Sequence, residues 1–242
     1  MRRRAPLALV ALLAPLVCLG GPPFLTDDPE PTDTGHWEIY APYFEAEGRG
    51  NTFAGSSGAE LNFGAAKNLQ LTVGLPAAYT HEAGLWHWGA GDFELSAKYR
   101  FYHDEDAGLQ VAIFPGVTLP TASRGLGAKS ATGLLPIWGQ KDFDEWSVFG
   151  GGGYAINPGS ENRDYWTGGL AITRSFGERL LLGLEADRRG RDAADGRAST
   201  SFGLGFIYDL PGPLRVLASG GPTHEDGGRT GFHAFVALGI ER

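Results

Sequence analysis

The clearest pattern in the chain is a strict alternation of apolar and polar side chains over residues 91–101. One parity holds the apolar Phe93, Leu95, Ala97, Tyr99 and Phe101, and the other holds the polar Asp92, Glu94, Ser96, Lys98 and Arg100. Successive side chains of a β-strand point to opposite faces, so this stretch predicts a strand with one apolar and one charged face. The apolar face could meet either a protein core or lipid.

The same period of two recurs along the rest of the chain. It is clear over residues 37–43, 69–79, 109–117, 180–186, 202–208 and 232–240, and weaker over residues 59–64, 131–140, 146–154, 166–174 and 214–220. With the first segment this predicts about 12 strands, and no stretch convincingly predicts a helix.

The connections between these segments alternate between long and short. The long ones cover residues 45–56, 80–90, 120–130, 157–164, 189–197 and 221–230, and the short ones cover residues 64–68, 103–108, 141–145, 176–179 and 209–213. The short set is rich in Asp, Gly and Pro, which favour tight turns. This rhythm predicts an up-and-down meander. With an even number of strands, both chain termini then lie at the tight-turn end, as in outer-membrane barrels.

The outer face decides between a soluble and a membrane barrel. A lipocalin-like soluble barrel needs about eight strands and a polar outer face. Here the apolar parity carries almost no charge, and aromatic residues bound several stripes, as with Trp37 and Tyr43 or Trp146 and Tyr154. We therefore predict an all-β fold, a single antiparallel up-and-down transmembrane β-barrel of about 12 strands. A secreted soluble β-protein remains the alternative, and the chain ends in Glu241-Arg242 without the terminal aromatic residue of many such barrels.

The N-terminus predicts export. Three arginines follow Met1 and precede an apolar stretch over residues 5–19 that is too short to span a membrane, so residues 1–20 are expected to be a signal peptide cleaved near Gly20 or Gly21. Val17 before Cys18 disfavours a lipid anchor. Residues 21–35 form a Pro- and acid-rich lead, for which disorder is the favoured interpretation and an inserted plug the alternative. Residues 36–242 would form the barrel, in the bacterial outer membrane.

Composition narrows the partners. The chain has 38 glycines, 12% aromatic residues and a formal net charge of −8, which disfavours nucleic acid as a partner. The expected partners are outer-membrane lipid, a small-molecule solute and the barrel-assembly machinery. We expect no cofactor.

Three motifs resemble a known family. They are residues 21–31 (GPPFLTDDPEP) followed by GHWE at 35–38, residues 91–101, and residues 114–121 (FPGVTLPT). Together they resemble the outer-membrane proteins associated with the meta-pathway of phenol degradation, over most of the mature chain. The resemblance implies a barrel that passes small, aromatic or apolar molecules, and it implies no catalytic residues.

Charged side chains on the inward parity are the best functional candidates. They are expected to line the lumen and to set its selectivity, and they comprise Asp92, Glu94, Lys98, Arg100, Glu185, Asp187, Arg189, Glu38 and Arg215. The second interpretation, which we favour, is that these side chains pair across strands and fill the interior.

Other chemistry has weaker support. His81, Glu82 and His87 lack metal-ligand spacing, so no metal site is expected. No nucleophile elbow surrounds Ser219, so a hydrolase dyad of Ser219 and His224 is not favoured. The glycines at 150–153 lack the lysine that follows in a phosphate loop. They favour a bend in the strand or a place where side chains or a plug approach the backbone closely. We therefore predict a non-enzymatic channel or transporter, with a sealed structural barrel as the second hypothesis and a membrane-embedded lipid hydrolase as the third.

Overall fold

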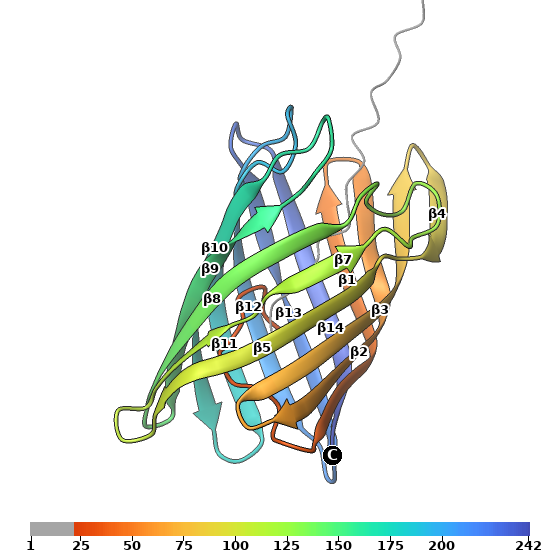
Figure 1. Cartoon of the computed structure of the whole chain (residues 1–242). Coiled ribbons are helices and arrows are strands. Elements are labelled where there is room, and N and C mark those ends of the chain that lie inside the picture. Colours follow the sequence, from red (N-terminus) through yellow and green to blue (C-terminus); the bar gives the residue numbers. More distant parts are fainter. Residues whose placement is uncertain (1–21) are drawn as a thin grey trace, which may run out of the picture.

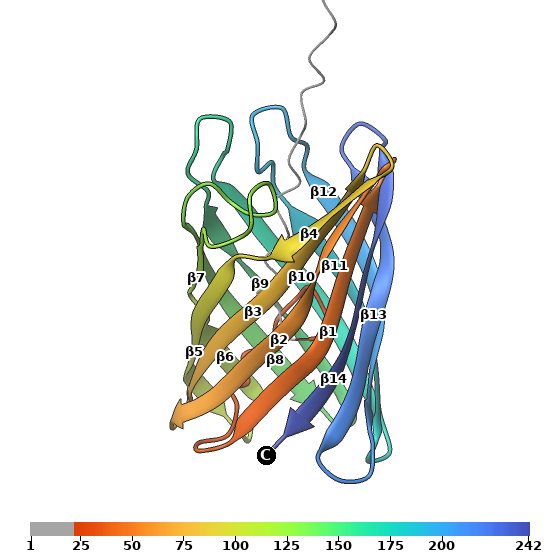
Figure 2. The same ribbon diagram turned by 90° about the vertical axis from the view of Figure 1, so that its right-hand side faces the viewer.

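The structure, a computed structural model that describes residues 22–242, is one antiparallel sheet closed into a barrel (Figures 1 and 2). Its strands are β1 (Trp37–Arg49), β2 (Thr52–Ala66), β3 (Leu69–Glu82), β4 (Leu85–Ala90), β5 (Phe93–Asp104), β6 (Leu109–Ile113), β7 (Gly116–Leu119), β8 (Thr132–Phe143), β9 (Trp146–Ile156), β10 (Tyr165–Phe176), β11 (Leu180–Arg189), β12 (Ser199–Asp209), β13 (Leu214–Glu225) and β14 (Thr230–Glu241). Closure comes from β14, which pairs with β1 with Ile39 opposite Ile240.

Two of the wall strands are interrupted, so the 14 strands make 12 spans. β4 and β5 pair with successive parts of β3, and β6 and β7 both lie between β5 and β8. The second interruption falls at Phe114-Pro115, where proline has no N–H to give to the ladder. The predicted fold class and strand number are confirmed. No helix among residues 22–242 has the length and apolarity needed to cross a membrane.

The two ends of the barrel differ as expected, but not in every connection. The C-terminal residue lies at the tight-turn end, where Arg242 and Trp37 exchange backbone hydrogen bonds of 2.7 and 2.8 Å. Long loops occur at residues 120–131, 157–164 and 190–198. The long connections predicted at 45–56, 80–90 and 221–230 are wrong, because these strands continue beyond the apolar band, where side chains facing water need not be apolar.

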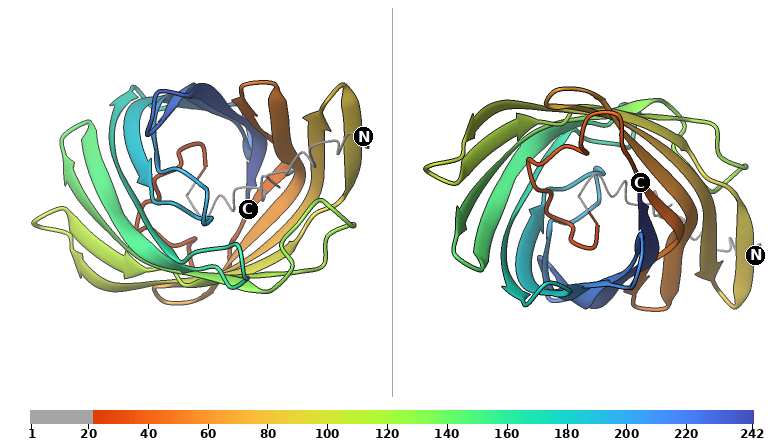
Figure 3. Two further views of the ribbon diagram at one scale, coloured as in Figure 1. Left: turned by 90° about the horizontal axis from the view of Figure 1, so that it is seen from above. Right: turned by 90° about the horizontal axis from the view of Figure 1, so that it is seen from below.

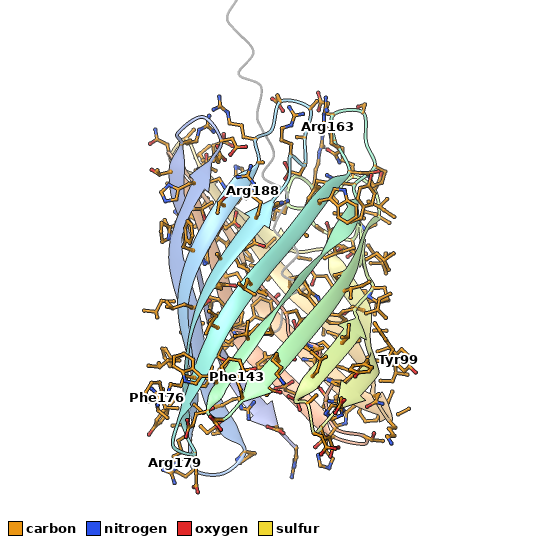
Figure 4. The ribbon with its side chains drawn as sticks, turned by 90° about the vertical axis from the view of Figure 1, so that its left-hand side faces the viewer. Tyr99, Phe143, Arg163, Phe176, Arg179 and Arg188 are labelled. Atoms are coloured by element: carbon orange, nitrogen blue, oxygen red, sulfur yellow. The ribbon has the colours of Figure 1, made fainter. Side chains whose placement is uncertain are left out.

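The outer face of the barrel is apolar along its middle. Leu184 and Leu204, opposite one another in the register, are each 62% exposed. Exposed aromatic side chains mark the tight-turn end (Figure 4), among them Tyr99, Phe143 and Phe176, and others, such as Trp88, Trp166 and Phe232, mark the loop end. An apolar band between two aromatic girdles is the surface that a membrane barrel presents to lipid.

One aromatic residue was assigned to the wrong face. The register of β1 shifts between Tyr40 and Tyr43, with Pro42 inside the bulge. The extra residue reverses the parity, so Tyr43 is buried at 8% exposure instead of pairing with Trp37 on the outer surface. Strict alternation cannot reveal such a reversal.

The N-terminal segment lies inside the barrel (Figure 3). Phe24, Thr26 and Asp27 are at most 3% exposed, and Pro29 is fully buried. We call residues 22–35 the plug. The favoured interpretation of this stretch as disordered is therefore wrong, and the alternative of an inserted plug is the arrangement observed. The predicted signal peptide at residues 1–20 lies outside the described residues.

Candidate functional site: the plugged lumen

The plug is seated by one aromatic side chain in a recess of the barrel wall. Phe24 packs edge-on against Phe149, with ring centroids 6.1 Å apart, and against Ala171 and Leu181. A Cβ at Gly183 would lie 2.4 Å from the Phe24 ring, and one at Gly205 would lie 2.7 Å from it. The two glycines therefore create the space that the ring fills.

The backbone that follows Phe24 is bound by the lumen wall. The Glu185 carboxylate accepts hydrogen bonds from the N–H groups of Leu25 and Thr26, at 3.1 and 3.0 Å. The Ser219 hydroxyl donates to the carbonyl of Pro23. Further along, Gln70 accepts from both the N–H and the hydroxyl of Thr32, at 2.8 and 3.0 Å. The plug is thus bound at several points along its length.

A buried ion pair forms the strongest polar contact between plug and wall. Lys98 Nζ lies 3.0 Å from Asp27 Oδ1 and 3.7 Å from Asp28 Oδ1, and it donates to the carbonyl of Glu30 at 3.3 Å. The Lys98 side chain is 5% exposed and that of Asp27 is fully buried. Phe114 packs beneath the ammonium, 4.9 Å from ring centroid to Nζ.

Asp27 is held in an environment that opposes its charge. Burial raises the pKa of its carboxyl to about 7, against the lowering effect of Lys98 and with a smaller raising effect from Asp28. Its second oxygen, Oδ2, and the neighbouring Thr26 hydroxyl have no hydrogen-bond partner among the described residues. The contact therefore fixes the plug without satisfying every polar atom in it.

A cavity of about 400 Å³ remains between the plug and one side of the wall. Most of its wall residues come from β1, β2, β3 and β5. Two basic side chains line it, Lys98 and Arg215, together with seven acidic ones, Asp28, Glu30, Asp33, Glu38, Glu60, Glu94 and Glu241. The lining of the cavity therefore has a strong excess of acidic over basic side chains.

Ion pairs occupy both mouths of the lumen. At the tight-turn end, Arg215 contacts Glu38, Asp209 and Glu241 at 3.4, 3.1 and 2.7 Å. At the loop end, Arg49 contacts Glu47 and Glu225 at 3.3 and 3.1 Å, and Arg189 contacts Asp192 at 2.8 Å. These pairs stiffen the mouths and cancel part of the lumen charge.

The predicted lumen residues thus fall into separate groups. Lys98 and Glu185 bind the plug, Glu94 lines the cavity, Glu38 and Arg215 pair at the tight-turn mouth, and Asp187 and Arg189 stand on the inward face near the loop end. Arg100 donates to Gln110 at 2.7 Å and to Asn68. Their role in selectivity stays a prediction.

Asp92 has a different place from the one expected. Its two carboxylate oxygens accept the N–H groups of Ala122 and Ala128 at 2.8 and 2.7 Å. The side chain is 3% exposed and caps the loop at residues 120–131, so it does not face the open lumen. The sequence shows the inward parity of Asp92 but not the loop that returns over it.

Several residues that build the site were missed. Asp27, Phe24 and Gln70 hold the plug, and Glu45 and Glu60 supply negative charge to the lumen. The acidic Asp-Asp-Pro-Glu-Pro stretch could have indicated a plug with basic partners. Those partners lie far away in the sequence, so the sequence alone does not identify them. The glycines at 150–153 mark a close approach, because added Cβ atoms would meet the backbones of β8 and β10 rather than the plug.

The geometry also separates the residues considered for hydrolysis. Ser219 has the inward parity of β13 and binds the plug, whereas His224 has the outward parity and contacts Phe202 at a centroid distance of 6.4 Å. They therefore form no dyad. Within residues 22–242, no three His, Cys, Asp or Glu side chains are grouped to hold a metal.

The lipid-facing wall, the plugged polar interior and the 12 spans define the class of outer-membrane β-barrels. Residues 45–236 match the family model described as "Putative MetA-pathway of phenol degradation", and the chain belongs to that family. No curated protein matches the sequence significantly.

Solved structures share the fold. An outer membrane channel from Pseudomonas putida F1 superposes with a TM-score of 0.69 at 17% identity, covering 89% of this chain and 98% of that one. The KdgM porin in complex with disordered oligogalacturonate gives 0.57 at 10% identity, covering 84% and 98%. The translocator domain of autotransporter NalP from Neisseria meningitidis gives 0.54 at 15% identity, covering 86% and 88%.

Proposed function

We propose that the protein passes small molecules across the outer membrane through a lumen that the plug narrows and that opens further when the plug moves. The observation that carries this proposal is the cavity of about 400 Å³ beside the plug. A lumen filled completely by the plug would leave no such space. We also propose that residues 1–20 are a signal peptide removed on export.

The lining of the cavity favours some solutes over others. Seven carboxylates against two basic groups repel anions and favour neutral or cationic solutes. The apolar and aromatic parts of the lining, Phe114, Tyr40 and Ile207, suit small aromatic or apolar molecules. The family description, which names phenol degradation, supports the same substrate class.

The second candidate is a structural barrel with a closed lumen. The ion pair between Lys98 and Asp27 and the hydrogen bonds of Glu185 to the plug favour it, because they hold the plug inside the lumen. The two functions differ in whether solute crosses the intact barrel.

Conductance separates the two candidates. The full mature chain and a variant lacking residues 22–33 are compared in planar bilayers and by solute flux into liposomes. We expect a small cation-selective conductance for the full chain and a larger one for the variant. Heat-modifiable gel migration of both proteins serves as the control for folding. Absence of conductance and of solute flux in both folded proteins would refute the channel.

A further inference from the structure

One arginine stands on the outer wall of the barrel, at the edge of the lipid-facing band. Arg174 lies near the end of β10 and shares its face of the strand with Leu170 and Ile172, which are both exposed on the outer surface. Phe176, two residues further along the same face, belongs to the aromatic girdle at the tight-turn end (Figure 4). Arg174 therefore points toward the membrane and not into the lumen.

Two girdle rings hold the Arg174 guanidinium. Arg174 lies opposite Trp146 in the register between β10 and β9, and its Cζ is 5.2 Å from the centre of the Trp146 ring. The same atom is 5.0 Å from the centre of the Phe176 ring. Each contact is a cation–π attraction, which becomes stronger where the cation is removed from water. The rings fix the position of the charge but offer no oxygen atom to its N–H donors.

The described part of the chain supplies no acceptor for these donors. Within residues 22–242, no oxygen accepts a hydrogen bond from Arg174, and its Nε is buried without a partner. Glu145 and Glu178, in the adjoining turns, are exposed and form no ion pair with it. A charged donor that is removed from water without an acceptor is costly. The site is therefore complete only with an acceptor from outside the described residues.

A second arginine on the outer wall shows the opposite arrangement. Arg188 has the outward parity of β11 near the loop end, and its two Nη groups donate to the Asp226 carboxylate at 3.0 and 2.7 Å. It also donates to the Thr200 hydroxyl at 2.8 Å. Among the described residues, the outward arginine at the loop end thus has a counter-charge, and Arg174 at the tight-turn end has none.

The membrane offers a matching acceptor at the depth of Arg174. Aromatic girdles lie at the level of the lipid headgroups, and two girdle residues enclose this guanidinium. The short turns of outer-membrane barrels face the periplasm, so this girdle meets the leaflet that is made of phospholipids. A phosphodiester presents two anionic oxygens to the forked N–H groups of an arginine, and such charge-assisted bonds are stronger than neutral ones.

We propose that Arg174, held between Trp146 and Phe176, binds the phosphate of one phospholipid of the inner leaflet. The exposed Leu170 and Ile172 lie further into the band and contact the acyl chains of the same lipid. The contact fixes the depth of the barrel at its periplasmic rim. It concerns the outer wall alone, so it does not depend on whether the lumen conducts solutes.

Lipid adducts of the folded barrel test the proposal. The protein is extracted from the outer membrane into a non-ionic detergent and mixed with phosphatidylglycerol or with diacylglycerol of the same acyl chains. Native mass spectrometry measures the fraction of protein with one bound lipid as a function of lipid concentration. We expect the first phosphatidylglycerol to bind about tenfold more tightly than diacylglycerol, because only phosphatidylglycerol carries the phosphate.

Variants locate the binding site. Arg174→Gln should weaken the binding of phosphatidylglycerol about tenfold and leave that of diacylglycerol unchanged. Arg174→Lys keeps the charge but not the fork and should fall between the two proteins. Trp146→Leu should weaken binding about threefold, because the ring holds the guanidinium in place. Arg188→Gln is the matched control, since that arginine already has a carboxylate partner, and it should bind lipid like the unmodified protein.

Four results would overturn the proposal. Equal affinity of the unmodified protein for the two lipids would mean that water and not phosphate satisfies Arg174, and this comparison requires no variant to fold. Unchanged affinity in Arg174→Gln protein with normal heat-modifiable migration would exclude Arg174 as the binding residue. A loss of affinity confined to Arg188→Gln would place the lipid at the loop end. An adduct of inorganic phosphate as stable as that of the lipid would identify a site for free anions.

Discussion

At the scale of single residues, Lys98 has the largest number of roles. Its ammonium is shared by Asp27, Asp28 and the carbonyl of Glu30, and it lies over the ring of Phe114. Removing one partner of a buried ion pair costs about 3 kcal/mol or more, because the other charge stays buried. The free energy that holds the plug in the lumen should depend on this one side chain more than on any exposed charge.

We therefore expect Lys98→Met to release the plug part of the time. Single-channel recordings should show a larger open fraction and a larger mean conductance than the unmodified protein. Lys67→Met, the same substitution at an exposed turn, is the control and should behave like the unmodified protein. An unchanged conductance in folded Lys98→Met protein would mean that the ion pair does not hold the plug.

Asp27 predicts how docking depends on pH. Burial raises the pKa of its carboxyl in the docked plug to about 7 from the ordinary 3.8, despite Lys98. The docked state therefore binds more protons than the released state, so docking is strongest at low pH and weakens as the pH rises from about 4 to about 7. We expect the open fraction to increase between about pH 5 and about pH 7 and to change little at higher pH.

Asp27→Asn is the control for this pH dependence, because an amide does not titrate in the range. Its open fraction should be nearly constant with pH. Equal pH profiles for the two proteins would assign the effect to another group, such as Glu30, whose pKa burial also raises.

At the scale of elements, alternation predicted the strands well because it depends on the local backbone. Within residues 93–101 and within residues 180–186, the side chains alternate between lipid and lumen as their parity indicates. The bulge near Pro42 reversed Tyr43, since one extra residue changes every later side chain of the strand. The plug could not be derived in the same way, because Leu25 and its partner Glu185 lie 160 residues apart.

The plug seat predicts a steric effect of glycine substitution. In Gly183→Ala the new methyl group would lie 2.4 Å from Phe24 and 2.8 Å from Thr173, so the Phe24 ring must leave its recess. We expect a conductance close to that of the variant without residues 22–33, with normal heat-modifiable migration. Gly139→Ala is the matched control, because its nearest contacts would be 3.8 and 4.0 Å away.

Removing the ring should reverse the steric effect. Phe24→Ala combined with Gly183→Ala exchanges a large side chain on the plug for a small one on the wall. We expect this double variant to conduct less than Gly183→Ala alone. A conductance as large as that of the single variant would indicate that the methyl group acts on the wall and not on the plug.

At the scale of the whole molecule, the barrel is arranged inside out compared with a soluble protein. Leucines cover its outside, while carboxylates, lysine and arginine lie within. This inversion is stable only if lipid covers the band between the two aromatic girdles. The depth of a residue in that band should therefore set the cost of placing a charge on the outer face.

Leu184 tests this arrangement because it lies midway along β11 and is 62% exposed. Leu184→Arg should lower the free energy of unfolding in lipid vesicles by about 2–4 kcal/mol, as expected for a charge near the bilayer midplane. Thr230→Arg, on the outer face where β14 begins at the loop end, should cost at most about 1 kcal/mol. Urea titration of vesicle-inserted protein measures both values. Equal and small costs for the two variants would mean that lipid does not cover Leu184, because water solvates an arginine side chain equally well at either place.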